Sequence, residues 1–127
     1  MSSVVLDASA LIAFLRSEPG SDIVGPALTD AAISSVNLSE VLAKAAETPK
    51  GFESAKMALK GLQLRVVPFD EEQAEIAAGL RPLTRPLGLS LGDRCCLALG
   101  LVEEIPILTT DRQWSKMPLG IQIRVIR

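Results

Sequence analysis

Five short apolar runs rich in β-branched residues alternate along this 127-residue chain with segments of helical periodicity. The expected strands cover residues 4–6, 31–36, 64–67, 105–109 and 121–126. The expected helices cover residues 10–15, 21–29, 38–45, 52–62, 70–80 and 91–102, and two prolines with a glycine predict a loop over 81–88. Strands that alternate with helices predict an α/β fold, a three-layer α/β/α sandwich around a mainly parallel five-stranded sheet.

The first and last expected strands have different patterns. Every residue of 4–6 is apolar, which indicates a strand buried on both faces. Over 121–126, the apolar residues at 121, 123 and 125 alternate with Gln122, Arg124 and Ile126. This alternation suits a strand at an edge of the sheet.

The segment 91–102 is apolar nearly all round, so we expect a buried central helix in which Gly100 permits close packing. It contains both cysteines of the chain, Cys95 and Cys96. Neighbours on a helix do not easily form a disulfide, and the pair is interpreted as small core residues. With no histidine and no other cysteine, zinc sites, Ser-His triads and Cys-His dyads are excluded.

The length predicts a single domain over residues 1–127. The 48% content of apolar residues and the lack of low-complexity segments indicate an ordered chain. No apolar run reaches the roughly 18 residues that span a bilayer. No basic segment precedes the first strand, so we expect no signal peptide, no membrane contact and a cytoplasmic location.

Four acidic residues stand where expected strands end or expected helices begin. Asp7 closes the first strand and Asp111 the fourth, Glu40 follows the second strand, and Asp93 opens the buried helix. Because parallel strands end at one edge of a sheet, we expect the four carboxylates to converge. Each pair about 4 Å apart repels by roughly 4 kcal/mol, so a cation or a shared proton must neutralise the cluster. Ligands that are all oxygen atoms favour Mg²⁺ or Mn²⁺.

Each acid also has a purely structural explanation. The spacing of a capping box occurs three times, in Asn37 with Glu40, Ser90 with Asp93, and Thr110 with Gln113. Asp7 has the position of an ordinary N-cap. Capping does not require four acids at one edge, however, so the metal hypothesis is the one that explains them together.

The net charge of −2 argues against nucleic acid as a partner only until these four acids are set aside. Without them, 11 acidic residues remain against 13 basic ones, so the rest of the chain carries +2. Arg85, Arg94 and Arg112 lie close to the proposed ligands along the chain. We expect them either to contact phosphate groups or to pair with the acids.

Four segments of the chain, in order, resemble a PIN-domain ribonuclease, specifically a VapC-type toxin of a toxin–antitoxin pair. They are VVLDASALIAFL at 4–15, ISSVNLSEVL at 33–42, LSLGDRCCLALG at 89–100 and PILTTDRQW at 106–114. Together with the single-domain length, the resemblance covers essentially the whole chain and implies a PIN-like fold.

The resemblance implies an acidic quartet that holds one or two Mg²⁺ or Mn²⁺ ions, made of Asp7, Glu40, Asp93 and Asp111. Ser9 and Thr110 match hydroxyl positions near that site, where they would orient carboxylates or water. Ser9 has the alternative role of an ordinary hydroxyl early in a helix. Trp114 follows the last acid, and we expect it in the core or an interface rather than stacked on a base.

The implied activity is endonucleolytic hydrolysis of RNA by metal-activated water, which leaves 5′-phosphate and 3′-hydroxyl ends. The implied partners are a VapB-type antitoxin, seated partly on the helical hairpin 38–62, and a second copy of the chain in a homodimer. One alternative is a non-catalytic PIN-like module that binds RNA or a partner. Another is a phosphoryl-transfer domain of the receiver or haloacid-dehalogenase kind, although Ser9 stands where the latter has a second aspartate.

Overall fold

In the computed structural model, which describes residues 2–127, five strands form one sheet in the order β3–β2–β1–β4–β5. The strands are β1 (Val4–Leu6), β2 (Ala31–Ser34), β3 (Arg65–Val67), β4 (Ile107–Thr109) and β5 (Ile123–Val125). All four pairings are parallel, so the sheet is entirely rather than mainly parallel. The carboxyl ends of the strands therefore share one edge, and β5 lies at a side of the sheet as predicted.

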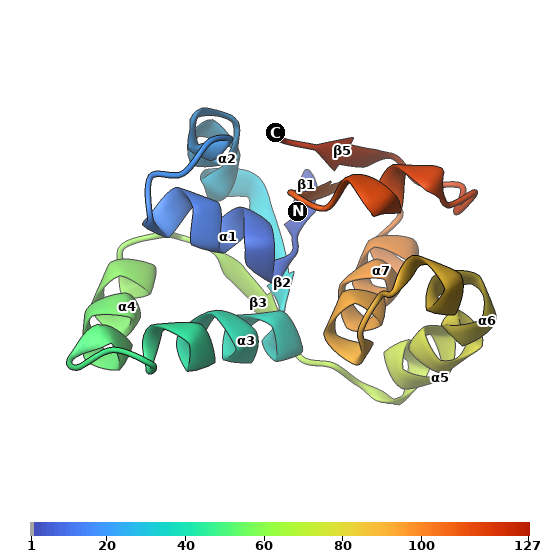
Figure 1. Cartoon of the computed structure of the whole chain (residues 1–127), viewed down its shortest axis with the longest axis horizontal. Helices are drawn as coiled ribbons and strands as arrows, with labels where there is room; N and C mark the ends of the chain where they lie inside the picture. Colours follow the sequence, from blue (N-terminus) through green and yellow to red (C-terminus); the bar gives the residue numbers. More distant parts are fainter. Residues whose placement is uncertain (1) are drawn as a thin grey trace.

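Helices connect the strands and cover both faces of the sheet (Figure 1). The α-helices are α1 (Ala8–Leu15), α2 (Ser21–Ala27), α3 (Ser35–Ala45), α4 (Gly51–Lys60), α5 (Glu71–Gly79), α6 (Arg81–Thr84) and α7 (Leu91–Glu103). The described residues also include three short 3₁₀ helices, η1 (Leu28–Asp30), η2 (Arg85–Leu87) and η3 (Arg112–Lys116). The predicted α/β class is confirmed.

The sheet separates two hydrophobic cores. Leu6 points into the first core with Leu11 of α1 and Val41 of α3. Val5, its neighbour on the same strand, points into the second core with Leu97 of α7. Successive residues of a strand face opposite sides, so this division establishes the three-layer arrangement predicted from the sequence. Figure 1 shows α1 and α2 on one side of the sheet and α5, α6 and α7 on the other.

The prediction of a loop over 81–88 is wrong, because α6 and η2 occupy residues 81–87. Pro82 and Pro86 each stand second in their helix, where the missing N–H breaks no helical hydrogen bond. Gly88 ends the pair of helices with a positive φ of 72°.

Two strand boundaries also differ from the prediction. The second strand ends at Ser34 because its hydroxyl accepts a hydrogen bond from the Val36 N–H and caps α3. The last strand is shorter than 121–126, and Ile126, which follows it, lies buried in the first core. The Ile126 N–H donates to the Thr109 carbonyl and so continues the parallel pairing of β4 with β5 beyond Val125.

The central helix α7 is buried along most of its length. A Cβ on Gly100 would lie 2.7 Å from Ile107 Cγ1, so the predicted close packing at this glycine is confirmed. Cys95 and Cys96 are buried free thiols, and Trp114 is fully buried in the second core. Leu91 is 59% exposed, so the helix is not buried at its N-terminal end. Among the described residues, no helix has the length and apolar character to cross a membrane.

Candidate active site

The four acids singled out from the sequence line one cleft of about 480 Å³ at the carboxyl edge of the sheet. Asp7 follows β1 and Asp111 follows β4, its parallel neighbour. Glu40 lies on α3 and Asp93 in the first turn of α7. The walls of the cleft are Asp7, Ala8, Ser9, Ile12, Glu40, Asp93, Thr110 and Asp111. The fold therefore brings the predicted quartet around one cavity, together with both predicted hydroxyl residues.

Asp7 is the most buried of the four, with 4% of its surface exposed. Its Oδ1 accepts a hydrogen bond from the Ala10 N–H at 2.8 Å, and Ser9 Oγ lies 2.7 Å from Oδ1 and 2.9 Å from Oδ2. Burial raises the pKa of Asp7 to about 6, against the hydrogen bonds of Thr109, Ser9 and Ala10, and the charge of Asp93 adds to the rise. Asp7 is thus held in one orientation in a place that disfavours its charge.

Thr109 is a site residue that the sequence reasoning missed. Its hydroxyl donates to Asp7 Oδ2 at 2.6 Å and accepts from the Asp111 N–H at 3.0 Å, so it links two of the acids. Thr110, the predicted hydroxyl, contributes its backbone N–H to Ser9 Oγ at 3.0 Å. The available signal was a polar residue at the buried end of an apolar strand, two positions before Asp111.

Three of the four acids also cap helices. Asp7 caps α1, Asp93 forms the predicted capping box with Ser90, and Asp111 caps η3 by accepting the Gln113 N–H at 2.9 Å. The box predicted for Thr110 and Gln113 is wrong, because the helix begins one residue later, at Arg112. The caps of Asp93 and Asp111 each use a single carboxylate oxygen. Capping and ligand binding are therefore compatible roles for these residues.

Glu40 is held in a different way. The predicted capping box of Asn37 and Glu40 is wrong, because α3 begins at Ser35 and Ser34 is its N-cap. Asn37 instead lies inside the helix and its Nδ2 donates to Glu40 Oε1 at 2.8 Å. The Glu40 side chain is exposed at the mouth of the cleft.

The charge of the four acids is not balanced by basic side chains. The ion pairs among residues 2–127 join Lys44 to Glu47, Lys56 to Glu53, Arg65 to Glu103, and Arg127 to Glu18. Each of these pairs lies outside the cleft. The expectation that nearby arginines pair with the acids is therefore wrong within the part of the chain that the structure describes.

The three arginines proposed to meet phosphate are not among the residues that line the cleft. Arg94 is directed toward α5, where its Nη1 donates to the Ala77 carbonyl at 2.9 Å. Arg112 Nε donates to the Arg127 carbonyl at 3.2 Å, and its side chain is exposed. Arg85 is exposed on η2. Arg85 and Arg112 are accessible to a ligand that extends beyond the cleft.

The donors in the cleft suit a hard divalent cation in kind, since every side-chain donor there is an oxygen atom. A cation beside Asp7 would also favour the ionised form that burial now disfavours. Within residues 2–127, no three acidic or thiol side chains lie close enough together to share an ion. The side chains of the cleft thus have the oxygen donors of a metal centre, but the carboxylates lie farther apart than ligands of one bound ion.

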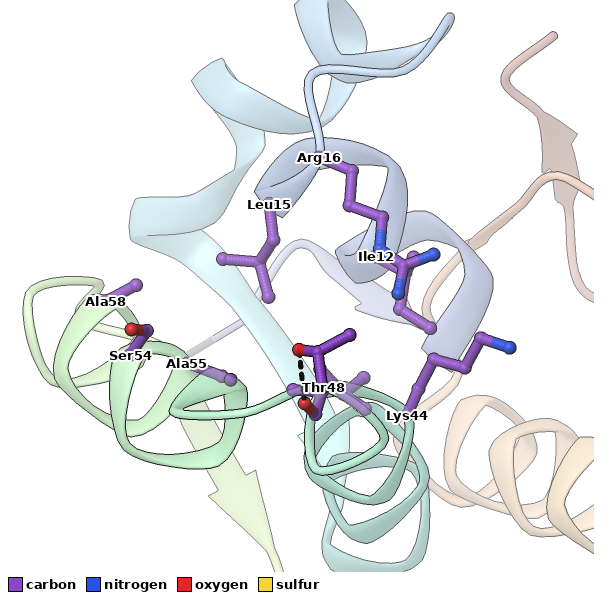
Figure 2. A pocket seen from close by; sticks show the side chains of 11 residues that line it. Ile12, Leu15, Arg16, Lys44, Thr48, Ser54, Ala55 and Ala58 are labelled. Atoms are coloured by element: carbon purple, nitrogen blue, oxygen red, sulfur yellow. Dashed lines mark hydrogen bonds between the residues drawn. The ribbon is translucent and has the colours of Figure 1, made fainter.

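An apolar groove of about 310 Å³ adjoins this cleft between α1, α3 and α4 (Figure 2). Its floor and walls are mostly aliphatic, and Ile12 lines both the groove and the acidic cleft. Arg16 and Lys44 bring positive charge to the groove, and Thr48 donates from its hydroxyl to the Ala45 carbonyl at 3.2 Å. The two cavities are therefore neighbours that share a wall.

Several solved structures share this fold. A chain of a toxin–antitoxin complex from Klebsiella pneumoniae is 19% identical, with 98% of each chain covered and a TM-score of 0.79. A chain of DNA-bound VapBC from Salmonella typhimurium is also 19% identical, with 98% of each chain covered and a TM-score of 0.75. For FitAcB from Neisseria gonorrhoeae the identity is 20%, the TM-score 0.72, and the coverage 94% of this chain and 95% of that one.

A search among curated proteins finds no match. The model of the PIN domain family, in contrast, matches residues 4–119, which include the strand that delivers Asp7 and all four acids of the cleft. This match confirms the resemblance inferred from the four motifs. The chain belongs to the PIN domain family.

Proposed function

We propose that this protein is a metal-dependent endoribonuclease and the VapC-type toxin of a toxin–antitoxin pair. The observation that carries the proposal is the cleft in which Asp7, Glu40, Asp93 and Asp111 meet without a basic partner among residues 2–127. Asp7 carries the cost of this arrangement, because burial disfavours its charge, and a bound cation would supply the missing positive charge. The PIN domain provides the context in which RNA is the expected substrate.

The four carboxylates would hold Mg²⁺ or Mn²⁺, which when bound would supply a Lewis acid to activate water and to neutralise charge on a phosphodiester. Asp7 offers the most fixed position, because Ser9, Ala10 and Thr109 hold its two oxygens. Glu40, Asp93 and Asp111 line the same cleft from α3, from the first turn of α7 and from the segment after β4. No protein nucleophile is required, and the products would carry 5′-phosphate and 3′-hydroxyl ends.

The exposed Arg85 and Arg112 are the basic side chains that we assign to the RNA backbone beyond the cleft. Arg94 has no such role in this arrangement, because it is engaged with the Ala77 carbonyl. The scissile phosphate would then be bound at the acids while flanking phosphates meet the arginines.

The apolar groove beside the cleft is the surface that we assign to a VapB-type antitoxin. Its aliphatic lining suits apolar side chains of an antitoxin segment, and Arg16 and Lys44 suit acidic ones (Figure 2). Because Ile12 lines both the groove and the acidic cleft, a segment that lies in the groove could extend past this residue and place an arginine in the cleft. One solved structure with this fold is a chain of a toxin–antitoxin complex, and another belongs to the VapBC family of toxin–antitoxin systems.

We also propose a homodimer. Phe52 and Met57 on α4 and Val66 on β3 are large apolar side chains that are exposed in a single chain. These side chains are available to pack against a second copy of the chain, where they would be removed from water.

Chelation tests the proposal. The purified protein, incubated with cellular RNA, should cleave it in the presence of Mg²⁺, stop when EDTA is added, and resume when Mn²⁺ is supplied in excess. Sequencing of the fragments should find 5′-phosphate ends at a restricted set of sites. Cleavage that is indifferent to EDTA would refute the metal mechanism, and RNA that is bound but left intact would favour the non-catalytic alternative.

A further inference from the structure

Glu40 lacks the helix-capping hydrogen bonds that orient the other three acids. It is the member of the quartet that does not cap a helix, and it extends from the exposed surface of α3. A free glutamate in such a place samples many rotamers and loses that freedom when it binds a ligand. We propose that Asn37 and Gly92 are positioning residues that together seat the Glu40 carboxylate against the first turn of α7, beside Asp93.

Asn37, the single asparagine of the chain, is 1% exposed and lies one helical turn before Glu40. Its Nδ2 donates both to Glu40 Oε1 at 2.8 Å and to the Gly92 carbonyl at 2.9 Å. Both partners are acceptors, so the amide nitrogen must face them and the orientation of the Asn37 side chain is determined. The bond to Gly92 fixes the donor, and the donor in turn fixes the carboxylate.

Gly92 provides the space for that carboxylate. A Cβ at this position would lie 2.6 Å from Glu40 Cδ and 2.7 Å from Glu40 Oε1, closer than real Cβ atoms come to their neighbours. Any other residue would therefore push the Glu40 side chain away from α7. The helix N-terminus beneath it also carries partial positive charge, which favours a carboxylate in this place.

The place of the Glu40 carboxylate lies where two helices meet, since α3 packs directly against α7. Asn37 and Glu40 come from one helix, and Gly92 and Asp93 from the other. The same contact that buries Asn37 thus sets Glu40 next to Asp93, on the helical side of the cleft. The assignment rests on the proposed function, because the reason to hold Glu40 still is the divalent cation it would help to bind.

Calorimetric titration of the full-length protein with Mn²⁺ tests the assignment without any measurement of cleavage. Gly92→Ala should weaken Mn²⁺ binding about tenfold or more, the range seen when a group that orients a metal ligand is lost. Gly79→Ala is the matched control, since a Cβ on that helical glycine meets nothing within 4 Å. It should leave Mn²⁺ affinity unchanged.

A double-mutant cycle separates positioning of Glu40 from a general structural role. Once Glu40→Ala has removed the side chain, Gly92→Ala has nothing to displace and should cause no further loss of Mn²⁺ affinity. An equal loss in both backgrounds would overturn the assignment. So would an unchanged affinity for Gly92→Ala while the wild type binds Mn²⁺, a result that leaves the proposed function standing.

Asn37→Asp provides a second variant of the same shape, in which an acceptor oxygen replaces the donor Nδ2 that faces Glu40 Oε1 and the Gly92 carbonyl. It should weaken Mn²⁺ binding at temperatures where circular dichroism shows it folded. Gln73→Glu is its control, because Gln73 is another buried amide, 2% exposed, that donates to the Pro68 carbonyl away from the cleft. A wild type that binds no Mn²⁺ would overturn both the proposed function and the assignment, whereas equal affinities of Asn37→Asp and wild type would overturn only the assignment.

Discussion

The two sides of the acidic cleft are built in different ways. On the strand side, Asp7 and Asp111 are joined through Ser9, Thr109 and the Thr110 N–H in one hydrogen-bonded network. On the helix side, Glu40 reaches in from an exposed position and Asp93 is tied mainly to its own capping box. The strand side is fixed by the backbone of β1 and β4, whereas the helix side depends on how α3 packs against α7.

The difference also concerns energy. Burial makes the charge of Asp7 unfavourable, which its raised pKa of about 6 expresses. Glu40 remains in contact with solvent and retains its hydration. Burial of Asp7 thus lowers the stability of the metal-free protein, whereas the solvent-exposed Glu40 carries no such cost. We expect metal binding to offset the cost at Asp7.

Removal of a single charge on either side should have the largest effect. Asp7→Asn and Asp93→Asn should each reduce RNA cleavage by more than about 100-fold, since even loss of a group that only orients a metal ligand reduces activity 10- to 100-fold. Urea unfolding of the metal-free variants should show unchanged or higher stability, because repulsion among the acids is relieved.

Asp70→Asn is the control for these two variants. Asp70 caps α5 through the Gln73 N–H, outside the cleft, and its replacement should leave cleavage intact. A large loss of metal-free stability in Asp7→Asn or Asp93→Asn, with cleavage retained, would show that capping is the main role of these aspartates.

The next largest effect should be a pH dependence of the free energy of unfolding that comes from Asp7, on the strand side of the cleft. The pKa of Asp7 rises from 3.8 to about 6 on folding, so the native state binds the extra proton between these values. Stability therefore falls as pH rises through this window, by about 2–3 kcal/mol from this group alone. Urea unfolding of the metal-free wild type and Asp7→Asn at pH 4 and pH 7 isolates the effect, since other carboxylates contribute equally to both. An identical pH dependence in the two proteins would contradict the buried-charge interpretation.

Loss of one hydroxyl on the strand side should have a smaller effect. Thr109→Val keeps the shape of the side chain and removes both the donor to Asp7 and the acceptor for the Asp111 N–H. We expect Mn²⁺ affinity to fall 10- to 100-fold and stability to fall by about 1–3 kcal/mol. Thr84→Val removes another buried hydroxyl, bonded to the Leu80 carbonyl, and should lower stability without changing Mn²⁺ affinity. Equal Mn²⁺ affinities in both variants would show that Thr109 does not orient Asp7.

The strand side was also easier to predict from the sequence. Asp7 and Asp111 each follow an apolar run, and parallel strands place such residues at one edge whatever the details of packing. Glu40 and Asp93 could be assigned to the site from the motifs that contain them. The way in which Glu40 is held beside Asp93 could not be predicted. The hydrogen bond from Asn37 to the Gly92 carbonyl joins residues 55 positions apart and exists only after α3 and α7 have packed.

Predictions from short sequence patterns were wrong where the same residues fit two local structures. Prolines at 82 and 86 favoured a loop, but both occupy first-turn positions that helices accept. The resemblance implied Thr110 as the hydroxyl near the acids, whereas the structure has the Thr109 hydroxyl on Asp7 and the Thr110 N–H on Ser9. Thr109 is the last residue of β4 and Thr110 lies beyond it, so the end of the strand decides which hydroxyl faces Asp7.

The position of Ile12, one turn into α1, has a consequence for control of the proposed nuclease activity. Ile12 lines both the acidic cleft and the apolar groove, so we treat it as the boundary between them. A molecule that lies in the groove and crosses this boundary occupies space that RNA requires, so each ligand must lower the affinity of the other by the same factor. Accumulated RNA would then promote release of the inhibitor as effectively as the inhibitor excludes RNA, which makes the ratio of the two concentrations the quantity that sets activity.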